Sequence, residues 1–394
     1  MKRSKKVIML FSMSFLPNQG RYIRVYNQAK SLLKRFSEVK IIAWDREGNQ
    51  PPFAIVDGIK VERLHIKAGI EKGPLGNGLK VLLFNLIAFG KLILNRQEIE
   101  VIHAFNLDTM LPAIAAAKLL KKPAILDLCE PDYYAFWGEK YGFFLKLVNW
   151  LEKVISRRFD AVLVHNQYQI NKFKKYGVKR LRLIGSYPTY LVKQVKKHQN
   201  IEGKPVVIGR IGTIYANNGI EELVEAFGLL LKKHKNIKLM LAGRVYENYK
   251  ETFRQLIRPL GDKAEVIGAF PASQMPQLYQ KIDISVMLNR RTAWFKNITP
   301  TKFFDTLANG VPVVTSDIGG LKYIIEEYQC GYVVDETNPH EICAVLEKLV
   351  KNPSLRQKMA ENGLKAAWER FNWNLMEKYL LEVYEDVRKE KLAR

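Results

Sequence analysis

Residues 297–312 read NITPTKFFDTLANGVP, and they decide the fold class of their half of the chain. Thr299 is a favoured cap residue before a helix, and Pro300 suits the first helical position. The predicted helix ends at Asn309 and Gly310, and the apolar run VPVVTS that follows has the composition of a buried strand. A helix that leads straight into a buried strand is typical of a parallel sheet covered by helices.

The same alternation extends outward over the whole chain. One series of short apolar runs covers residues 7–11, 39–44, 101–103, 124–128 and 161–165. A second series covers residues 206–211, 237–241, 264–267, 284–288 and 311–315. Between runs of the second series, one helical stripe contains Ile220, Leu223, Val224, Phe227, Leu230 and Leu231. We therefore predict an α/β protein of two Rossmann-like parallel-sheet domains.

The polar, lysine-rich residues 186–205 separate the two series, and we place the domain boundary there. The predicted domains are residues 1–190 and 204–372. Residues 373–394 form a terminal amphipathic helix, which we expect to pack back on the N-terminal domain. Ligands of open α/β sheets bind beyond the carboxyl ends of the strands. Two such domains would therefore face one another across an interdomain cleft.

Composition restricts the classes of protein that the chain can belong to. Its 394 residues favour two or three domains, and 47% hydrophobic residues exclude a disordered chain. The three cysteines, Cys129, Cys330 and Cys343, form no C-x-x-C pair, and no Cys/His cluster has zinc spacing. The net charge of +24 indicates an anionic partner or surface. Nucleic acid, anionic lipid and nucleotide phosphate all qualify, and so does plain solubility.

Targeting and membrane signals are weak. The apolar residues 7–11 after the basic start are too short for a secretory signal. Residues 79–94 are apolar but are interrupted by Lys80, Asn85 and Lys91, whereas a spanning helix needs roughly 20 apolar residues. We expect a cytoplasmic protein without a transmembrane segment.

The helix predicted after Thr299 has the features of an anion site. The backbone N–H groups of Thr301 and Lys302 would point out of the positive end of the helix, where Lys302 adds a full charge. Asp305 lies four residues after Thr301 on the same helical face, where a carboxylate can accept hydrogen bonds from two ribose hydroxyls. An ordinary capped helix with a surface aspartate has the same pattern, so the neighbouring segments must distinguish the two.

The neighbouring segments resemble family-4 glycosyltransferases. In the second half the matching pieces are GTIYANNGIEELVEAF, IKLMLAG, VIGAF, MPQLYQKIDISVML, PTKFFDTLANGVPVVTSDIGG and CGYVV. The first half is similar more loosely, through GRYIRVYNQAKSLLK, VIHAFNLDTMLPA and FDAVLVHN. The resemblance implies the GT-B fold, a nucleotide-sugar donor held mainly by the second domain, transfer with retention, and no metal or other cofactor.

The resemblance assigns donor-binding positions. Asp305 stands where the family has the glutamate that holds the ribose, and Asn297 stands where a glutamate contacts the transferred sugar. Gly212 and Gly219 match the ends of the glycine loop, whereas Thr213 and Asn218 replace its usual arginine and lysine. The charge of the diphosphate must then be met elsewhere, and Lys302 is our first choice. The other basic residues near this edge are Arg210, Arg244, Arg290, Arg291 and Lys296.

The remaining donor contacts are expected around Phe270, where backbone groups would read a uracil or guanine base. Gly20 in the first half resembles the glycine loop that lies near the donor phosphates or the acceptor. The donor is thus expected to be a UDP- or GDP-sugar, and the acceptor a glycan or a lipid-linked glycan.

The chemistry that the resemblance implies is electrostatic, with Lys302 stabilising charge on the departing diphosphate. Asp127 or Glu130 could serve as general base, and His103 ends a strand and could face the cleft. A histidine near a strand end is also a common structural residue. Cys129 stands where many relatives have a histidine, so that feature is missing here.

Two stretches, residues 78–96 and 143–158, are apolar with basic residues at intervals. They predict either peripheral contact with an anionic membrane surface or two ordinary core helices. A nucleotide-sugar epimerase of GT-B architecture and a basic non-catalytic binding protein on a transferase scaffold are the alternative functions. No RNA- or DNA-binding module is recognisable, so we expect no nucleic-acid partner.

Overall fold

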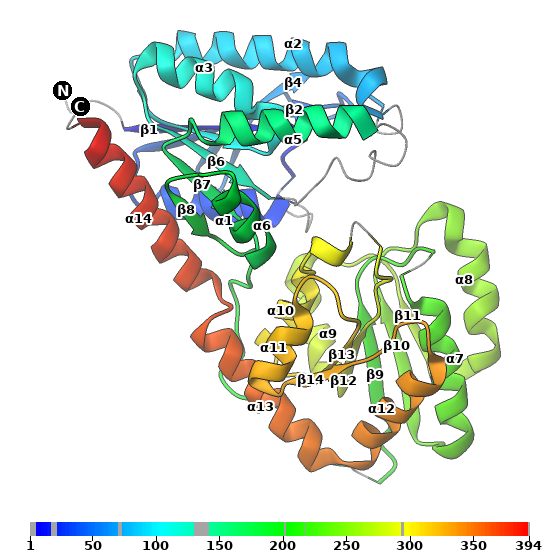
Figure 1. The fold of residues 1–394 in the computed structure, drawn as a ribbon. Helices are drawn as coiled ribbons and strands as arrows, with labels where there is room; N and C mark the ends of the chain where they lie inside the picture. The colour runs from blue at the N-terminus through cyan, green and yellow to red at the C-terminus, as the bar shows by residue number, and fades with distance from the viewer. Residues whose placement is uncertain are drawn as a thin grey trace. The chain divides into compact units, whose positions relative to one another are not determined.

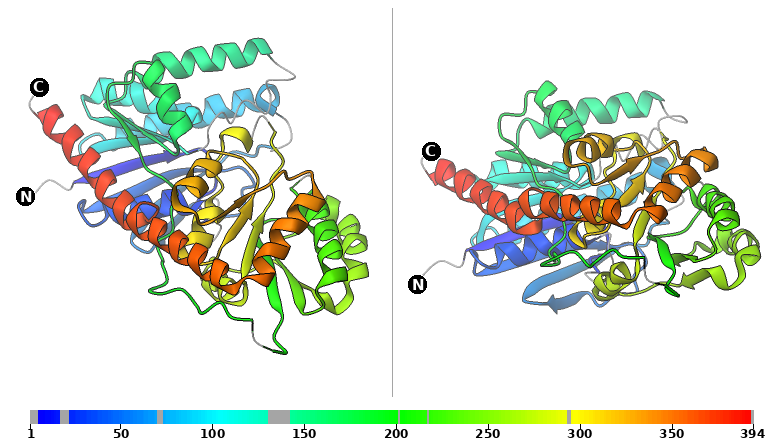
Figure 2. Two further views of the ribbon diagram at one scale, coloured as in Figure 1. Left: turned by 60° about the horizontal axis from the view of Figure 1, so that its bottom comes forward. Right: turned by 90° about the horizontal axis from the view of Figure 1, so that it is seen from below.

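The protein is described by a computed structural model that covers residues 5–16, 22–69, 73–129, 142–200, 202–216, 218–292 and 295–392. The chain divides into two compact units (Figures 1 and 2). Unit 1 comprises Met1–Ser186 and Asn374–Arg394, and unit 2 comprises Tyr187–Trp373. Each unit is an α/β structure around one sheet, as the alternating pattern predicts. The cleft expected between the two sheets stays a prediction.

Unit 1 is built on an eight-stranded sheet in the order β3-β4-β2-β1-β5-β6-β7-β8, parallel except for the edge hairpin of β3 with β4. The strands are β1 (Lys6–Phe11), β2 (Glu38–Asp45), β3 (Phe53–Val56), β4 (Ile59–His65), β5 (Ile99–Phe105), β6 (Ala124–Leu128), β7 (Ala161–Val164) and β8 (Leu181–Leu183). The helices are α1 (Ile23–Leu32), α2 (Gly73–Leu94), α3 (Met110–Leu120), α5 (Gly142–Ser156), α6 (Gln167–Lys175) and α14 (Trp373–Leu392).

The two faces of the unit 1 sheet bury different side chains because neighbouring residues of a strand point in opposite directions. One face carries Ile102, Ala104 and Leu126, which pack in an apolar core with α2, α3, α5 and α6. The intervening residues His103 and Asp127 point to the other face and contact α14 and α1 instead.

The α14 face holds a buried polar network. Asp127 is fully buried and accepts hydrogen bonds from both Nη2 of Arg24 (2.9 Å) and Nε2 of Gln28 (2.5 Å). Burial lowers the pKa of Arg24, but the adjacent Asp127 outweighs it, and the net pKa is raised. His103, also fully buried, lies 2.5 Å from the hydroxyl of Tyr384 on α14. The His103–Tyr384 contact fastens the terminal helix α14 to the sheet, and the Asp127 bonds fasten α1 to it.

Unit 2 is built on a six-stranded parallel sheet in the order β11-β10-β9-β12-β13-β14. The strands are β9 (Val206–Ile211), β10 (Ile237–Ala242), β11 (Ala264–Ile267), β12 (Ile284–Met287), β13 (Val313–Thr315) and β14 (Gly331–Val333). The helices are α7 (Ile220–Lys233), α8 (Lys250–Ile257), α9 (Met275–Lys281), α10 (Thr301–Ala308), α11 (Leu321–Tyr328), α12 (Pro339–Lys351) and α13 (Pro353–Glu369).

Helices cover both faces of this sheet. Residues of α7, α8 and α12 share one core, and residues of α10, α11 and α13 share another. The stripe predicted for α7 is confirmed, with Leu223 and Phe227 fully buried in the first core. The strand order steps outward from β9 to β11 on one side and from β12 to β14 on the other. The reversal between β9 and β12 is the switch point beside which such sheets bind ligands.

The stretch expected as a polar linker is largely folded against unit 2. The Tyr187 ring meets the Phe304 ring edge-on at 4.6 Å, and the Val192 N–H donates to the Ala308 carbonyl (2.9 Å). Asn200 accepts a hydrogen bond from the buried Arg356 (2.7 Å). The few apolar residues of this stretch show no helical or strand period, because they pack beside α10 and α13 without forming a helix or strand.

The Arg24–Asp127 pair generates a first prediction. Replacing Asp127 by Asn leaves the buried Arg24 charge uncompensated, so the free energy of unfolding should fall by about 3 kcal/mol. Urea unfolding of the wild type, Asp127→Asn and Arg24→Met/Asp127→Asn would measure it, and the double variant should recover part of the loss. An Asp127→Asn protein of wild-type stability that has lost only activity would instead support the role of general base.

Burial of His103 generates a second prediction. Burial lowers its pKa to about 4, from 6.5 when it is exposed. As the pH falls from 6.5 to 4, the unfolded chain therefore binds a proton that the folded chain refuses. We expect stability to drop over this window, by about 3 kcal/mol from this residue. Urea unfolding at several pH values should show a shallower drop for His103→Gln, whereas His340→Gln, at an exposed site, should keep the wild-type slope. Equal slopes for all three proteins would contradict the assignment.

Candidate functional site

The loops that follow the parallel strands of unit 2 gather at one edge of the sheet. β9 pairs in parallel with β10 on one side and with β12 on the other, and β12 pairs with β13. Their carboxyl ends therefore point the same way and bring together segments that are far apart in the sequence. The predicted donor residues on this edge are Gly212, Thr213, Gly219, Arg244, Phe270, Arg290, Asn297, Thr301, Lys302 and Asp305.

The glycine loop after β9 has room only for glycine at its key positions. Gly219 has φ +75° and ends the loop directly before α7, and a Cβ there would lie 2.1 Å from the Leu288 carbonyl oxygen. Gly243, after β10, has φ +149°, and its Cβ would lie 2.0 Å from the Gly212 carbonyl oxygen. These approaches bring the backbone of the loop tightly against the neighbouring strand ends.

The start of α10 differs by one residue from the prediction. The helix begins at Thr301 with Pro300 in the cap position, so the expected cap by Thr299 is wrong. The Thr299 hydroxyl instead donates to the Gly319 carbonyl oxygen (2.7 Å) and fastens the loop before α10 to the loop after β13. Gly319 has φ +55°, and a Cβ there would lie 2.0 Å from the Ile298 carbonyl oxygen. Tertiary contact between two loops has thus taken the hydroxyl that local capping would use.

Lys302 and Asp305 lie together on the first turns of α10. The Lys302 Nζ is 3.0 Å from an Asp305 carboxylate oxygen and 3.3 Å from the Met275 sulfur. Both side chains are partly exposed, at 30% and 20%. Beneath them the buried Tyr279 hydroxyl donates to the Lys302 carbonyl oxygen (3.2 Å). A cation and a carboxylate are therefore held side by side at a helix start, where they can meet an anion and vicinal hydroxyls.

A buried cation lies under the glycine loop. Arg210 on β9 is 5% exposed, and its two Nη atoms donate weakly, at 3.4 Å, to the carbonyls of Thr213 and Asn218. Within the described ranges no carboxylate lies at ion-pair distance from it, although the charge of Glu221 acts to raise its pKa, and its Nε has no hydrogen-bond partner. Burial lowers the pKa of Arg210 to about 10, so it stays charged at neutral pH. The two carbonyls that it reaches belong to the loop positions where the family resemblance expects basic residues.

Other predicted residues of this edge have structural partners. Arg290 forms an ion pair with Glu222 on the first turn of α7, and the Arg244 carbonyl accepts from the Ile214 N–H (2.9 Å). Phe270 is half-buried against a small apolar core beside α9. Asn297 ends the short helical turn Phe295–Asn297 and is half-buried. The Arg291 N–H donates to buried Glu336 (3.0 Å), a contact that no sequence motif signalled.

The catalytic residues predicted in unit 1 stay predictions, and the structure places two of them in the interior. Asp127 and His103 are fully buried, and their partners are Arg24, Gln28 and Tyr384. As the structure stands, neither side chain can meet an acceptor hydroxyl, because strand alternation turns both toward α1 and α14. Gly20 and Glu130 lie outside the described residues.

The carboxyl ends of β1 and β5 form the switch point of unit 1. Here the buried Ser12 hydroxyl donates to an Asp108 carboxylate oxygen (2.9 Å). Asn106 has φ +59° and ψ 179°, a backbone conformation that residues other than glycine rarely adopt. Its Oδ1 accepts a hydrogen bond from the Cys129 N–H (2.9 Å). Asn106 and Asp108 were not predicted from the sequence. The signal that could have found them is the run Asn-Leu-Asp directly after a buried strand.

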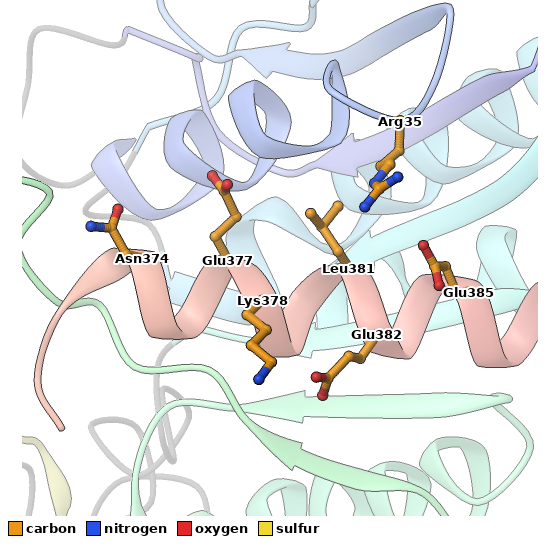
Figure 3. A pocket seen from close by; sticks show the side chains of 7 residues that line it. All are labelled: Arg35, Asn374, Glu377, Lys378, Leu381, Glu382 and Glu385. Atoms are coloured by element: carbon orange, nitrogen blue, oxygen red, sulfur yellow. The ribbon is translucent and has the colours of Figure 1, made fainter. Parts of the chain in front are cut away.

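A hollow of about 330 Å³ lies on the other side of unit 1, along α14. Figure 3 shows Glu377, Leu381 and Glu385 on the side of α14 that faces Arg35. Glu377 accepts hydrogen bonds from Ser31 (2.7 Å) and Lys34 (2.5 Å). Its lining mixes the glutamates with Arg35 and Lys378, and it includes none of the predicted donor residues.

Comparison with known proteins agrees with this geometry. The family model for glycosyl transferases group 1 matches residues 192–366, and the model for a glycosyl transferase 4-like domain matches residues 20–185. The capsular polysaccharide biosynthesis glycosyltransferase CapM of Staphylococcus aureus is 26% identical over 199 residues. That match covers 50% of each protein, so the chain spans about half the length of this curated relative.

Solved structures match over nearly the whole chain. Sucrose-phosphate synthase from Thermosynechococcus elongatus has a TM-score of 0.75 at 16% identity, covering 97% of this chain and 99% of that one. Anabaena HepE, solved in complex with UDP-glucose, has a TM-score of 0.68 at 15% identity, covering 96% and 99%. At such identities the likeness shows the fold alone, which is GT-B. The two family matches together take in most of the chain, and the protein therefore belongs to the GT-B glycosyltransferases of the group 1, family-4-like kind.

Proposed function

We propose that the protein transfers a hexose-type sugar from a UDP-sugar, with a GDP-sugar as second choice, to a glycan or lipid-linked acceptor. The observation that carries the proposal is the Lys302–Asp305 pair at the start of α10, on the ligand-binding edge of the unit 2 sheet. The structure of HepE in complex with UDP-glucose supports a uridine donor, and the name of CapM supports a polysaccharide product. We also propose a cytoplasmic location.

Each donor group has a chemical counterpart on this edge. Lys302 and the first N–H groups of α10 would hold the diphosphate, and Asp305 would accept hydrogen bonds from the ribose hydroxyls. On nucleotide binding Lys302 exchanges its contact with Asp305 for a phosphate oxygen, which frees the carboxylate for the ribose. Asn297 would bind a hydroxyl of the sugar, and backbone groups around Phe270 would contact the base.

The reaction is a glycosyl transfer with retention and without a metal. The acceptor oxygen bonds to the anomeric carbon on the face from which the diphosphate leaves, and the anomeric carbon–phosphate oxygen bond breaks. The acceptor proton passes to the departing diphosphate. Lys302 and the helix start stabilise the charge that develops on this leaving group, which is the task a metal performs in other enzymes. Activity should therefore survive treatment with a chelator.

Arg210 acts in this proposal as a positioning residue. It replaces the missing basic side chains at positions 213 and 218 by placing a guanidinium beneath the loop rather than in it. Its positive charge is poorly compensated in the interior of unit 2, so an anion bound on the loop would be favoured there.

Nucleotide binding tests the site directly. A thermal-shift screen of UDP-, GDP- and ADP-sugars at one concentration should give the largest stabilisation with a UDP-sugar, because stabilisation rises with the logarithm of the ratio of ligand concentration to Kd. Lys302→Ala should lower the affinity for both UDP and pyrophosphate by about 10- to 100-fold, which is the contribution of a charged hydrogen bond. Asp305→Ala should weaken the binding of UDP but not of pyrophosphate. Lys365→Ala, at an exposed position of α13, should change neither affinity. Unchanged UDP binding in Lys302→Ala would remove the phosphate assignment.

Arg210 can be separated from an ordinary structural arginine. Arg210→Met should lower the affinity for UDP by about tenfold while the free energy of unfolding stays equal or rises, because an unpaired buried cation is removed. The control is Arg356→Met, which removes another buried unit 2 arginine that donates to the Leu349 carbonyl (2.6 Å). It should lose stability and keep UDP affinity. Should Arg210→Met behave like Arg356→Met, Arg210 has no role in donor binding.

A further inference from the structure

Large apolar side chains are exposed on one helical layer of unit 1. On α2, Leu79, Leu82 and Leu86 are 80%, 54% and 61% exposed. On α5, Phe143 and Trp150 are 83% and 58% exposed. The helix α3, which carries further exposed leucines, contacts both α2 and α5, so the three helices form one continuous layer (Figure 1). We call this layer, α2, α3 and α5, the apolar face.

Packing within unit 1 does not account for these residues. α2 already buries a complete stripe, with Phe84, Ala88 and Leu92 fully inside the core. Leu79, Leu82 and Leu86 are three and four residues apart, so they share another side of the helix, where they are exposed. The segment Asn77–Leu94 is long and apolar enough to cross a membrane by length and composition alone. Only 22% of its residues are buried inside the structure. A helix that is apolar all round is normally covered on every side.

The charges on the apolar face have one sign. The three helices contain five lysines, Lys80, Lys91, Lys118, Lys146 and Lys153, and a single acidic residue, Glu152. Glu152 is buried and pairs with Lys172 (2.6 Å). Lys91 pairs with Glu62 on β4, whereas the other four lysines form no ion pair with the described residues. The solvent side of these helices therefore presents leucines and aromatic rings interspersed with these four cations.

We propose that the apolar face docks on an anionic lipid bilayer, with α2 and α5 lying in the headgroup layer rather than crossing it. Exposed leucines and Trp150 would enter the boundary of the acyl chains, and the lysines would meet lipid phosphates. A second copy of the chain fits this face poorly, because it would bring like charges together. A spanning orientation of α2 would expose the core of unit 1, from which Phe84, Ala88 and Leu92 would be withdrawn. The inference stands independently of the donor site.

Vesicle flotation of the full chain tests the proposal. The protein should float with vesicles of phosphatidylcholine and phosphatidylglycerol, remain unbound with phosphatidylcholine alone, and be released by alkaline carbonate. Leu82→Glu/Trp150→Glu and Lys80→Glu/Lys146→Glu should each reduce the bound fraction about tenfold or more. The controls Ile55→Glu/Tyr323→Glu, at apolar sites 73% and 64% exposed elsewhere, and Lys358→Glu should bind like the wild type.

The outcomes separate the occupants of the face. Equal binding to both kinds of vesicle, retention after carbonate, or unchanged binding of the Leu82→Glu/Trp150→Glu variant would each overturn the proposal. So would a concentration-dependent dimer that the same variant dissociates while no vesicle binds. The thermal shift with UDP should be the same in every variant that folds, so failure of membrane docking is distinguishable from failure of the proposed transferase activity.

Discussion

Parallel pairing of β9 with both β10 and β12 is the constraint on which the candidate site depends. Because these strands are parallel, the loops that follow them lie at one edge of the sheet. The strand order changes direction between β9 and β12. Two close backbone approaches hold that edge together, Gly219 against Leu288 and Gly243 against Gly212. The start of α10 is then fixed from two sides, by Thr299 bonded to Gly319 and by Tyr279 bonded to the Lys302 carbonyl. Lys302 and Asp305 are presented by rigid elements, as a binding site requires.

Two of the buried arginines, Arg24 and Arg210, show how differently one kind of side chain can be used. Arg24 in unit 1 has its charge met by Asp127, which raises its pKa and makes the pair a part of the fold. Arg210 in unit 2 donates two long hydrogen bonds to carbonyl oxygens and forms no ion pair with the described residues, and burial lowers its pKa despite the nearby charge of Glu221. A compensated charge in the interior belongs to stability, whereas a poorly compensated one beside a ligand-binding loop points to an anion.

The net charge of +24 also has more than one use. Lys302 lies at the donor edge beside a carboxylate, whereas Lys80 and Lys146 lie on helices that expose leucines and aromatic rings and form no ion pair with the described residues. Bulk charge could not tell nucleotide phosphate from lipid phosphate. The side chains around each cation distinguish the two environments, because a carboxylate suits sugar hydroxyls and an apolar surround suits acyl chains.

The sequence by itself determined the fold class, the strands β6, β9 and β11 to the residue, and the edge on which Lys302 and Asp305 lie. These follow from local periodicity and from a general rule of parallel sheets. It missed β3, β4, β8 and β14, which are short or lie toward the edges of their sheets and whose pairing is decided by distant partners. Only the tertiary structure decided that Asp127 and His103 are buried, that Thr299 bonds a distant loop, and that α2 carries a second, uncovered apolar stripe. The reason is that the pattern of residues along a segment shows which of them share a face. The partner of each side chain depends on distant segments that the fold places next to it.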